Sequence, residues 1–402
     1  MNFSNIHTAL EIFKAGKPII VVDAVSRENE GDIIFPADTA TQDKINFCAS
    51  KGKGLICIAI DEKTAIRLDL QSIKSNQSDK FHTAFYEPID ASHQNGITTG
   101  ISALERSITA KLVSDPFSTP SDFIKPGHLF PIVAKKYGLF TREGHTEAGV
   151  DLCNITGHYP AAIICEIMND EGNMMRRAEL SQFAASIEIP IISIQQILEY
   201  RKQTENHIQL ISTAKLPTEF GDFLIHVFRN RITGIEHSVL EKNSHTEHKP
   251  IVRIHSECQT GDIFSSLRCD CKDQLEKSMK VIHENGNGLL IYLKGHEGRG
   301  IGLSNKIAAY AIQEKGYNTF EANLQLGLPE ENRNYLDAVW ILKFFKYSQF
   351  GLITNNADKL NALKSFTFQP NVVHVHSKIN EYNERYLNDK LIIANHTITF
   401  EK

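Results

Sequence analysis

The sequence contains no apolar run that approaches the roughly 20 residues of a membrane-spanning helix, so we expect no membrane insertion. Its first residues form an amphipathic helical pattern and lack the uninterrupted apolar core of a signal peptide. Seven cysteines, an odd number scattered over 402 residues, argue against a secreted disulfide framework. Together these absences predict a soluble protein of a reducing compartment, the cytoplasm.

The chain also lacks a strong charge of either sign. The formal net charge is −5 and no basic stripe is present, so we expect neither nucleic acid nor an anionic membrane as a partner. A length of 402 residues with 41% hydrophobic side chains is ample for two globular cores. A polar bridge at 201–207 separates the halves, so we predict domains at 1–205 and 206–402.

Both halves alternate short apolar runs with helical patterns. Strand patterns in the first half lie at residues 19–22, 33–35, 54–60, 161–168 and 190–194. Those in the second half lie at 223–228, 251–254, 289–293 and 351–356. Ser102 and Glu105 form a capping-box pattern that predicts a helix through Val113. We therefore predict an α/β (α+β) fold in each half, a mixed sheet with flanking helices, whose strand order the pattern leaves open.

An acidic stretch, Ser26–Asp32, lies between the first two of these strands. Glu28, Glu30 and Asp32 alternate, so in an extended segment their side chains would point the same way. Like charges held this close repel one another and are costly to desolvate unless cations share the site. Composition alone gives about equal weight to a solvated hairpin loop.

Three other polar groups interrupt apolar segments of the first half. His128 follows a Pro-Gly pair, and Glu166 lies inside an apolar run. His145 has the charged neighbours Arg142 and Glu147. A glutamate in a buried strand should be neutral or paired, unless it faces water from an edge strand. A single histidine such as His128 is more often a satisfied core or surface residue, an explanation that suits His145 less well.

The motifs at 27–32, 127–128, 142–147 and 165–170 together resemble 3,4-dihydroxy-2-butanone-4-phosphate synthase, over roughly the first 200 residues. The resemblance implies conversion of D-ribulose 5-phosphate to L-3,4-dihydroxy-2-butanone 4-phosphate plus formate. It also implies Mg²⁺ (or Mn²⁺) as the cofactor and a homodimer as the assembly.

The same resemblance assigns roles to individual residues of the first half. It makes Glu28 and His145 the ligands of the metal, and His128 and Glu166 the pair that transfers protons. Arginine suits the substrate phosphate. The implied substrate contacts are Arg27, Asp32, Arg142, Thr146 and Glu166, and the family's site is also lined at the positions of Glu30 and Cys57.

Three cysteines lie close together in the second half, at Cys258, Cys269 and Cys271. Thiolates at this spacing suit zinc, and three protein ligands leave one tetrahedral position for water, which is typical of a catalytic site. The alternative is that they are buried as small apolar side chains. The charged residues around them, Glu257 and Asp270 among others, favour zinc.

Two further segments of the second half suit phosphate groups. The glycine-rich turn 295–302 follows a predicted strand, and such turns let backbone N–H groups approach phosphates, although ordinary turns also collect glycine. Thr354 and Lys359 lie where another strand leads into a helix N-terminus.

The second half resembles GTP cyclohydrolase II over roughly residues 208 to 360, and the order of the halves is similar to that of bifunctional riboflavin biosynthesis enzymes. The resemblance implies that GTP is opened to 2,5-diamino-6-(5-phosphoribosylamino)pyrimidin-4-one with loss of formate and pyrophosphate. Zinc on the three cysteines would activate the attacking water. The implied GTP contacts are Arg253, His255, Ser256, Glu257, Gln274, Glu297, Gly298, Arg299, Tyr310, Thr319, Thr354 and Lys359.

One segment departs from the family pattern. Where the family has Asp-x-Arg-Asp-Tyr, with a proton-accepting aspartate and a nucleophilic arginine, this chain has Glu331, Arg333 and Asn334. The additional methylene of glutamate displaces the carboxylate by roughly an ångström, and such shifts can cost on the order of 100-fold in rate. An alternative is therefore a monofunctional synthase whose second half is a GTP- or zinc-binding regulatory or scaffolding module. A zinc-dependent nucleic-acid binder is disfavoured by the acidic charge balance.

Overall fold

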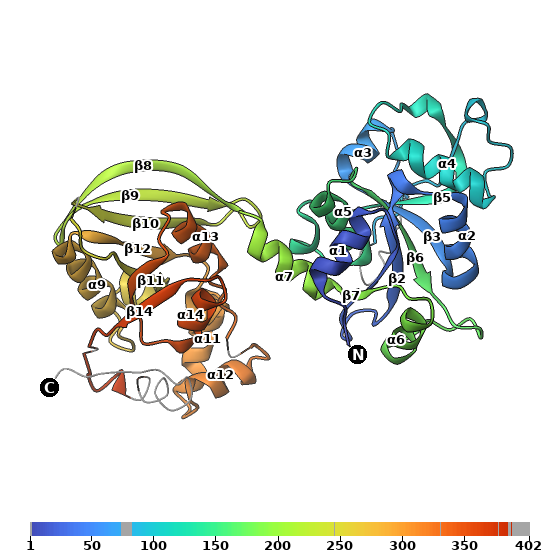
Figure 1. Ribbon diagram of the computed structural model, residues 1–402. Coiled ribbons are helices and arrows are strands. Elements are labelled where there is room, and N and C mark those ends of the chain that lie inside the picture. Colours follow the sequence, from blue (N-terminus) through green and yellow to red (C-terminus); the bar gives the residue numbers. More distant parts are fainter. Residues whose placement is uncertain are drawn as a thin grey trace. The chain divides into compact units, whose positions relative to one another are not determined.

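The computed structural model describes residues 2–73, 83–244, 246–329, 331–376, 378–384 and 387, apart from the side chains of Thr319 and Phe320. The chain divides into two compact units, Met1–Thr204 (the first unit) and Glu205–Lys402 (the second unit), each built on a seven-stranded sheet (Figure 1). Mixed sheets with flanking helices confirm the predicted fold class. In the described part of the chain, no helix has the length and apolar character needed to cross a membrane.

The sheet of the first unit has the strand order β4-β5-β3-β6-β2-β1-β7. Its strands are β1 (Ile19–Val22), β2 (Gly31–Pro36), β3 (Lys53–Ile60), β4 (Ile89–Ala91), β5 (Phe123–Val133), β6 (Ala161–Ile167) and β7 (Ile191–Ser193). β1 and β2 are antiparallel neighbours, so the acidic stretch begins in a hairpin loop, residues 23–30, and ends with Asp32 in β2. β6 lies between β3 and β2, so Glu166 is on an interior strand.

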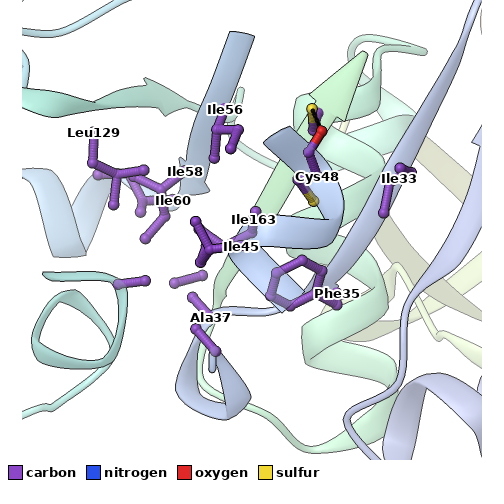
Figure 2. Packing of buried hydrophobic residues seen from close by; sticks show 14 of the residues in the cluster. Ile33, Phe35, Ala37, Ile45, Cys48, Ile56, Ile58, Ile60, Leu129 and Ile163 are labelled. Carbon is purple, nitrogen blue, oxygen red and sulfur yellow. Dashed lines mark hydrogen bonds between the residues drawn. The ribbon is translucent and has the colours of Figure 1, made fainter. Parts of the chain in front are cut away.

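Helices cover both faces of this sheet. They are α1 (Ile6–Lys14), α2 (Gln42–Phe47), α3 (Glu62–Arg67), α4 (Ala103–Val113), α5 (His145–Thr156), α6 (Arg177–Ser186) and α7 (Ile194–Thr204). Ser102 accepts a hydrogen bond from the backbone N–H of Glu105, which confirms the predicted start of α4. One apolar cluster, which includes Ile33 and Phe35, packs against α2, α4 and α6 (Figure 2). The opposite face packs against α1, α5 and α7 (Figure 1).

The register of the strands places three predicted site residues at one level of the sheet. Asp32 of β2 lies directly opposite Glu166 of β6. Cys57 of β3 lies opposite Ile164 of β6 on one side and Phe130 of β5 on the other. Glu166 lies two residues beyond Ile164 and His128 two residues before Phe130, which is the same direction along the sheet because β6 runs antiparallel to β3 and β5. Because side chains alternate along a strand, both belong to the face that carries Cys57 and α5. Glu166 on β6 and His128 on β5 are separated by β3, and two spacings between neighbouring strands amount to about 10 Å.

The sheet of the second unit has the order β14-β13-β11-β12-β10-β9-β8. Its strands are β8 (Ile208–Thr218), β9 (Gly221–Asn230), β10 (Glu236–Asn243), β11 (Ile251–Ser256), β12 (Asn287–Leu293), β13 (Gln349–Ile353) and β14 (Gln369–Val373). β8, β9 and β10 form an antiparallel meander, whereas β11 is parallel to its neighbours β12 and β13. The predicted strands of this half are thus all present.

Helices also flank this second sheet. They are α8 (Gln259–Asp262), α9 (Cys271–Asn285), α10 (Glu297–Gly300), α11 (Leu303–Gln313), α12 (Thr319–Gln325), α13 (Leu336–Phe344) and α14 (Ala357–Lys364). α9 covers one face through Met279 and Ile282, and α13 and α14 pack on the other (Figure 1). The connections that leave the parallel strands β11, β12 and β13 therefore emerge at one edge of the sheet.

Candidate active sites

The acidic loop of the first unit is shaped by Asp23, a buried residue that the sequence analysis did not single out. Its carboxylate accepts hydrogen bonds from the backbone N–H groups of Glu28 and Glu30, each at 2.9 Å, and from Nη1 of Arg27 at 3.1 Å. The loop is not extended: it turns at 25–28, and Asn29 has a φ of 58°. The extended segment that the alternation argument assumed therefore does not form, and the backbone is the hairpin loop of the alternative, although the carboxylates do gather.

His145, the first residue of α5, lies among these carboxylates. Its Nδ1 is 3.7 Å from Oε2 of Glu28 and 3.7 Å from Oδ1 of Asp32. Burial, the largest effect, would lower the pKa of His145, but Asp32 and Glu28 raise it to about 9. Burial raises the pKa of Asp32 to about 7 despite His145. Oδ1 of Asp32 and Nε2 of His145 are both buried without a hydrogen-bond partner among the described residues.

These atoms fit a divalent cation. Two ligands that are each about 2.1 Å from one Mg²⁺ lie at most about 4.2 Å apart, and Oε2 of Glu28 and Nδ1 of His145 are 3.7 Å apart. The unpartnered oxygen of Asp32 faces the same nitrogen. A hard cation would satisfy carboxylate oxygens whose mutual repulsion is otherwise costly.

Glu166 and Glu30 complete the acidic cluster. The side chain of Glu166 is exposed, as the alternative explanation had it, but β6 is an interior strand and not an edge strand. Burial therefore does not require Glu166 to be neutral or paired. Burial is the main cause that raises the pKa of the Cys57 thiol, and the charges of Glu166 and Asp32 add to it. Arg176 holds the loop from outside: it donates to the carbonyls of Glu28 and Asn29 and pairs with Glu30 at 3.3 Å.

His128 is held by a second residue that the sequence analysis missed, Asp90 of β4. Oδ2 of the buried Asp90 is 2.6 Å from Nδ1 of His128, and Oδ1 accepts from the backbone N–H of His128 at 2.8 Å. Gly127 permits this approach, since a Cβ there would lie 2.1 Å from the backbone carbon of Ile89. The imidazole is thus fixed through Nδ1, and its Nε2 is the nitrogen left for a substrate.

The remaining predicted substrate contacts of the first unit surround the start of α5. Nη1 of Arg142 pairs with the buried Glu147 at 2.7 Å, and Nη2 donates to Oγ1 of Thr83 at 3.0 Å. Thr146 is buried in the first turn of the helix. Arg27 pairs with Asp23 and, at 2.6 Å, with Glu28. Both arginines are therefore oriented by carboxylates before any ligand binds.

The second unit contains a cavity of about 410 Å³ at the edge where β11, β12 and β13 end. The predicted residues that line it are Arg253, His255, Ser256, Glu257, Cys258, Cys269, Cys271, Gln274, Glu297, Gly298, Arg299, Tyr310, Arg333, Thr354 and Lys359. Glu331 is not among the described lining residues, and the side chain of Thr319 lies outside the described part. One pocket thus collects segments that follow three parallel strands, the position in which such sheets bind ligands.

The three cysteines at one end of this cavity have the geometry of a metal centre. Sγ of Cys258 and Sγ of Cys269 are 3.8 Å apart, and the ligand atoms of all three lie within 4.8 Å of one another. Two sulfurs at about 2.3 Å from one tetrahedral zinc ion are separated by about 3.8 Å. Within the described residues this is the single group of three or more such ligand atoms that all lie within 4.8 Å of one another. The donor set and spacing fit zinc with one position open.

The other side of the cavity presents basic groups and a left-handed turn. Arg253 is buried and donates to Oε1 of Gln274 at 2.6 Å, and Nζ of Lys359 donates to the carbonyl of Ile254 at 2.8 Å. Gly298 and Arg299 both have positive φ, 59° and 66°. Both residues of this tight turn line the cavity, and turns of successive backbone N–H groups are a kind of structure that can bind anions.

A buried histidine that was not in the predicted set, His296, links two parts of the pocket. Its Nε2 donates to the carbonyl of Asn334 at 3.0 Å, so its Nδ1, 3.1 Å from Oγ of Ser256, accepts from that hydroxyl. Burial, reinforced by the charges of Arg333 and Lys359, lowers the pKa of His296 to about 4. The neutral ring leaves the oxygen of Ser256 free to accept a hydrogen bond from a ligand.

Glu331 and Arg333 form a local pair at the edge of the cavity. Oε1 of Glu331 accepts from Nε of Arg333 at 2.7 Å and from its backbone N–H at 2.9 Å, and Oε2 is in close contact with Nη2. The pKa of Glu331 is below its ordinary value, because Arg333 outweighs the opposing effect of burial. The longer glutamate side chain is therefore directed at its neighbour.

Comparisons with known proteins match each half of the chain to an enzyme family. A family model described as 3,4-dihydroxy-2-butanone 4-phosphate synthase matches residues 7–200, and one described as GTP cyclohydrolase II matches residues 209–373. The riboflavin biosynthesis protein RibBA of Aquifex aeolicus is 45% identical, over 96% of this chain and 96% of its own length. That of Staphylococcus aureus (strain COL) is 45% identical, over 99% of this chain and 100% of its own length.

The two-domain architecture also occurs in a solved structure. RibBX of A. baumannii, described as a two domain 3,4-dihydroxy-2-butanone 4-phosphate synthase, matches with a TM-score of 0.63 and 27% identity, over 92% of this chain and 99% of its own. The family matches and the full-length relatives confirm the predicted pair of enzyme activities. The chain belongs to the RibBA family of bifunctional riboflavin biosynthesis enzymes, in which a 3,4-dihydroxy-2-butanone 4-phosphate synthase is fused to a GTP cyclohydrolase II.

Proposed function

We propose that the synthase reaction takes place on the face of the first sheet that carries Glu28, Asp32, His145 and Glu166. There D-ribulose 5-phosphate would be converted to L-3,4-dihydroxy-2-butanone 4-phosphate and formate. The observation that carries this assignment is the position of Nδ1 of His145, 3.7 Å from two carboxylates. We propose Glu28 and His145 as ligands of Mg²⁺ (or Mn²⁺), which when bound would stabilise negative charge on the substrate oxygens.

The residues of this site divide the work of positioning and proton transfer. Nε2 of His128, oriented through Asp90, would exchange a proton with the substrate, and the exposed Glu166 carboxylate would serve a second transfer. Arg142 would bind the phosphate, since a guanidinium presents paired donors to phosphate oxygens. Arg27, Asp32 and Thr146 would contact the remaining oxygens.

For the second unit we propose that GTP occupies the cavity, with its base toward the cysteines. Cys258, Cys269 and Cys271 would hold Zn²⁺, which when bound lowers the pKa of a water molecule. The other predicted contacts (Arg253, His255, Ser256, Glu257, Gln274, Glu297, Gly298, Arg299, Tyr310, Thr319, Thr354 and Lys359) would bind the nucleotide. Arg333, which lines the cavity, would act on the α-phosphate, and Glu331 would accept a proton.

One observation favours a weaker second activity. Glu331 is engaged by Arg333 and is absent from the described cavity lining. A second unit that binds GTP and zinc mainly as a regulatory or scaffolding module would have this feature. The intact cysteine set and the lined cavity argue for turnover instead.

A formate assay run twice on the purified protein tests both halves. Ribulose 5-phosphate with Mg²⁺ should yield formate, and GTP with Mg²⁺ and retained zinc should do so as well. Formate from ribulose 5-phosphate alone would favour the alternative in which the second unit is a regulatory or scaffolding module. In that case, a Glu331→Asp variant that restored the GTP reaction would identify the additional methylene of Glu331 as the defect. Glu28→Ala and His145→Ala should each abolish the first reaction and preserve the second; full activity in either variant would refute the assignment of the metal site.

Assembly and location complete the proposal. We propose a homodimer in the cytoplasm with small-molecule substrates only, on the basis of the family resemblance and the chain's mild charge. Light scattering of the purified protein at micromolar concentration should give twice the chain mass of 45.2 kDa. A monomer that carries full synthase activity would contradict it.

A further inference from the structure

Lys306, on α11, is a buried cation beside the cysteine cluster. Its Nζ donates to Oε1 of Glu297 at 2.5 Å, to Oγ1 of Thr260 at 2.7 Å and to Sγ of Cys258 at 3.2 Å. Only 9% of Lys306 is exposed. Lysine is rarely buried without anionic partners, and here the ammonium group has two.

These contacts place Lys306 between a thiolate and a carboxylate that would otherwise repel each other. Three thiolates around one Zn²⁺ would leave a net charge of −1. The carboxylate of Glu297 adds a further negative charge nearby, because Nζ of Lys306 contacts both Glu297 and Cys258. Glu297 also accepts from the backbone N–H of Gln259 at 2.6 Å, so its position depends on the same segment that carries Cys258. A carboxylate oxygen is itself a good zinc ligand.

We propose that Lys306 is a positioning residue of the metal centre. Its ammonium group stabilises the thiolate of Cys258 and holds Glu297 as an ion pair, which keeps the fourth coordination position open. This inference rests on the proposed zinc site of the second unit. Lys306 also lines the cavity, and the proposal assigns its role to the contacts with Cys258 and Glu297 and not to the nucleotide.

The test compares metal binding by the full-length protein and its variants. Zinc affinity is measured by competition with a chromophoric chelator, and Co²⁺ is substituted for zinc to read the thiolate-to-cobalt charge-transfer band. Lys306→Met should weaken zinc binding by about 10- to 100-fold, the usual cost of losing such an outer partner. The cobalt band should move to longer wavelength, because a sulfur without its N–H donor gives up charge more easily.

Lys272 supplies a matched control. It follows Cys271 directly, but its exposed ammonium group contacts Oγ of Ser265 at 2.7 Å and Glu276 at 3.9 Å instead of a sulfur. Lys272→Met should therefore bind both metals as the wild type does. Lys306→Gln retains a polar group and removes the charge, so it serves as the test if Lys306→Met does not fold. It should show the same weaker zinc binding and the same shift of the cobalt band.

The outcomes distinguish the proposed role of Lys306 from the proposed zinc site on which it rests. Wild-type zinc affinity and an unshifted cobalt band in Lys306→Gln would overturn the role of Lys306 and leave the zinc site intact. A raised KM for GTP with unchanged metal binding would also overturn it, since this is the behaviour of a phosphate-binding lysine. A wild-type protein with no thiolate–cobalt band would overturn the zinc assignment and the role of Lys306 together.

Discussion

Asp23 offers the sharpest perturbation of the synthase site, because its carboxylate shapes the acidic loop without being part of the proposed chemistry. Replacing it with alanine removes the acceptor of two backbone N–H groups, those of Glu28 and Glu30, and breaks the ion pair with Arg27. The loop would then lose the contacts that direct Glu28 toward His145. We expect both the stability of the loop and the geometry of the metal site to suffer.

The size of the effect follows from these contacts. Hydrogen bonds to a charged partner contribute about 1.5–3 kcal/mol each, and water can replace part of that in a half-buried loop, so Asp23→Ala should cost the first unit about 2–4 kcal/mol. A displacement of Glu28 by roughly an ångström is enough to slow the reaction on the order of 100-fold. Asp23→Asn keeps an acceptor oxygen and should lose less on both counts.

The assay uses the two reactions of the chain as each other's control. Formate release from ribulose 5-phosphate should fall about 100-fold in Asp23→Ala, with formate release from GTP unchanged. Asp61→Ala is the matched control, since Asp61 caps α3 through the N–H of Thr64 at 2.9 Å and should cost about 1 kcal/mol with full synthase activity. Synthase turnover above about a third of wild type in Asp23→Ala, well short of the expected loss, would refute the idea that this carboxylate places the loop.

Three further outcomes are expected. Asp90→Asn should slow the synthase reaction at least about tenfold, because His128 loses the carboxylate that orients it; an undiminished rate would contradict this. His296 stays neutral in the folded state, with its pKa lowered to about 4, while the unfolded chain takes up a proton below its ordinary value of 6.5. Stability should therefore fall by about 3 kcal/mol as the pH drops from 6.5 through 4, and denaturant unfolding of His296→Gln should lack that component. Asp337 bridges two histidines at 2.6 and 2.8 Å, which overcome its burial and hold its pKa well below the ordinary value. Asp337→Ala should destabilise the second unit by about 3–5 kcal/mol, seen as a lower calorimetric Tm for that unit alone.

Features set by local spacing could be predicted from the sequence. The short separation of Cys258 from Cys269 and Cys271 limits how far apart the thiols can lie, and the structure places them within 4.8 Å. The corner at Thr354 could also be predicted, since an apolar run followed by Asn356 marks a strand that leads into a capped helix. Such patterns need no knowledge of the rest of the fold.

The acidic stretch shows where local reasoning fails. Alternation would bring Glu28, Glu30 and Asp32 together only in an extended segment, yet they converge because the chain turns around Asp23 and closes a hairpin. Strand order, which the sequence pattern left open, then places Asp32 opposite Glu166. The composition of the stretch thus identifies the group of residues, whereas its backbone is the hairpin that the sequence analysis gave as the alternative.

The residues missed share one property, which is that a distant partner gives each of them its role. Asp90 acts through a histidine 38 positions further along the chain, and Lys306 acts through a cysteine 48 positions before it. No period or spacing connects such pairs, because strand pairing and the return of α11 to the cysteines bring them together. A buried charge costs free energy unless its partner is placed to meet it, so residues of this kind can be found only after the fold is known. The same cost gives the substitutions at Asp23, Asp90 and Lys306 their expected effects, since each removes a buried charged group on which a partner depends for its position.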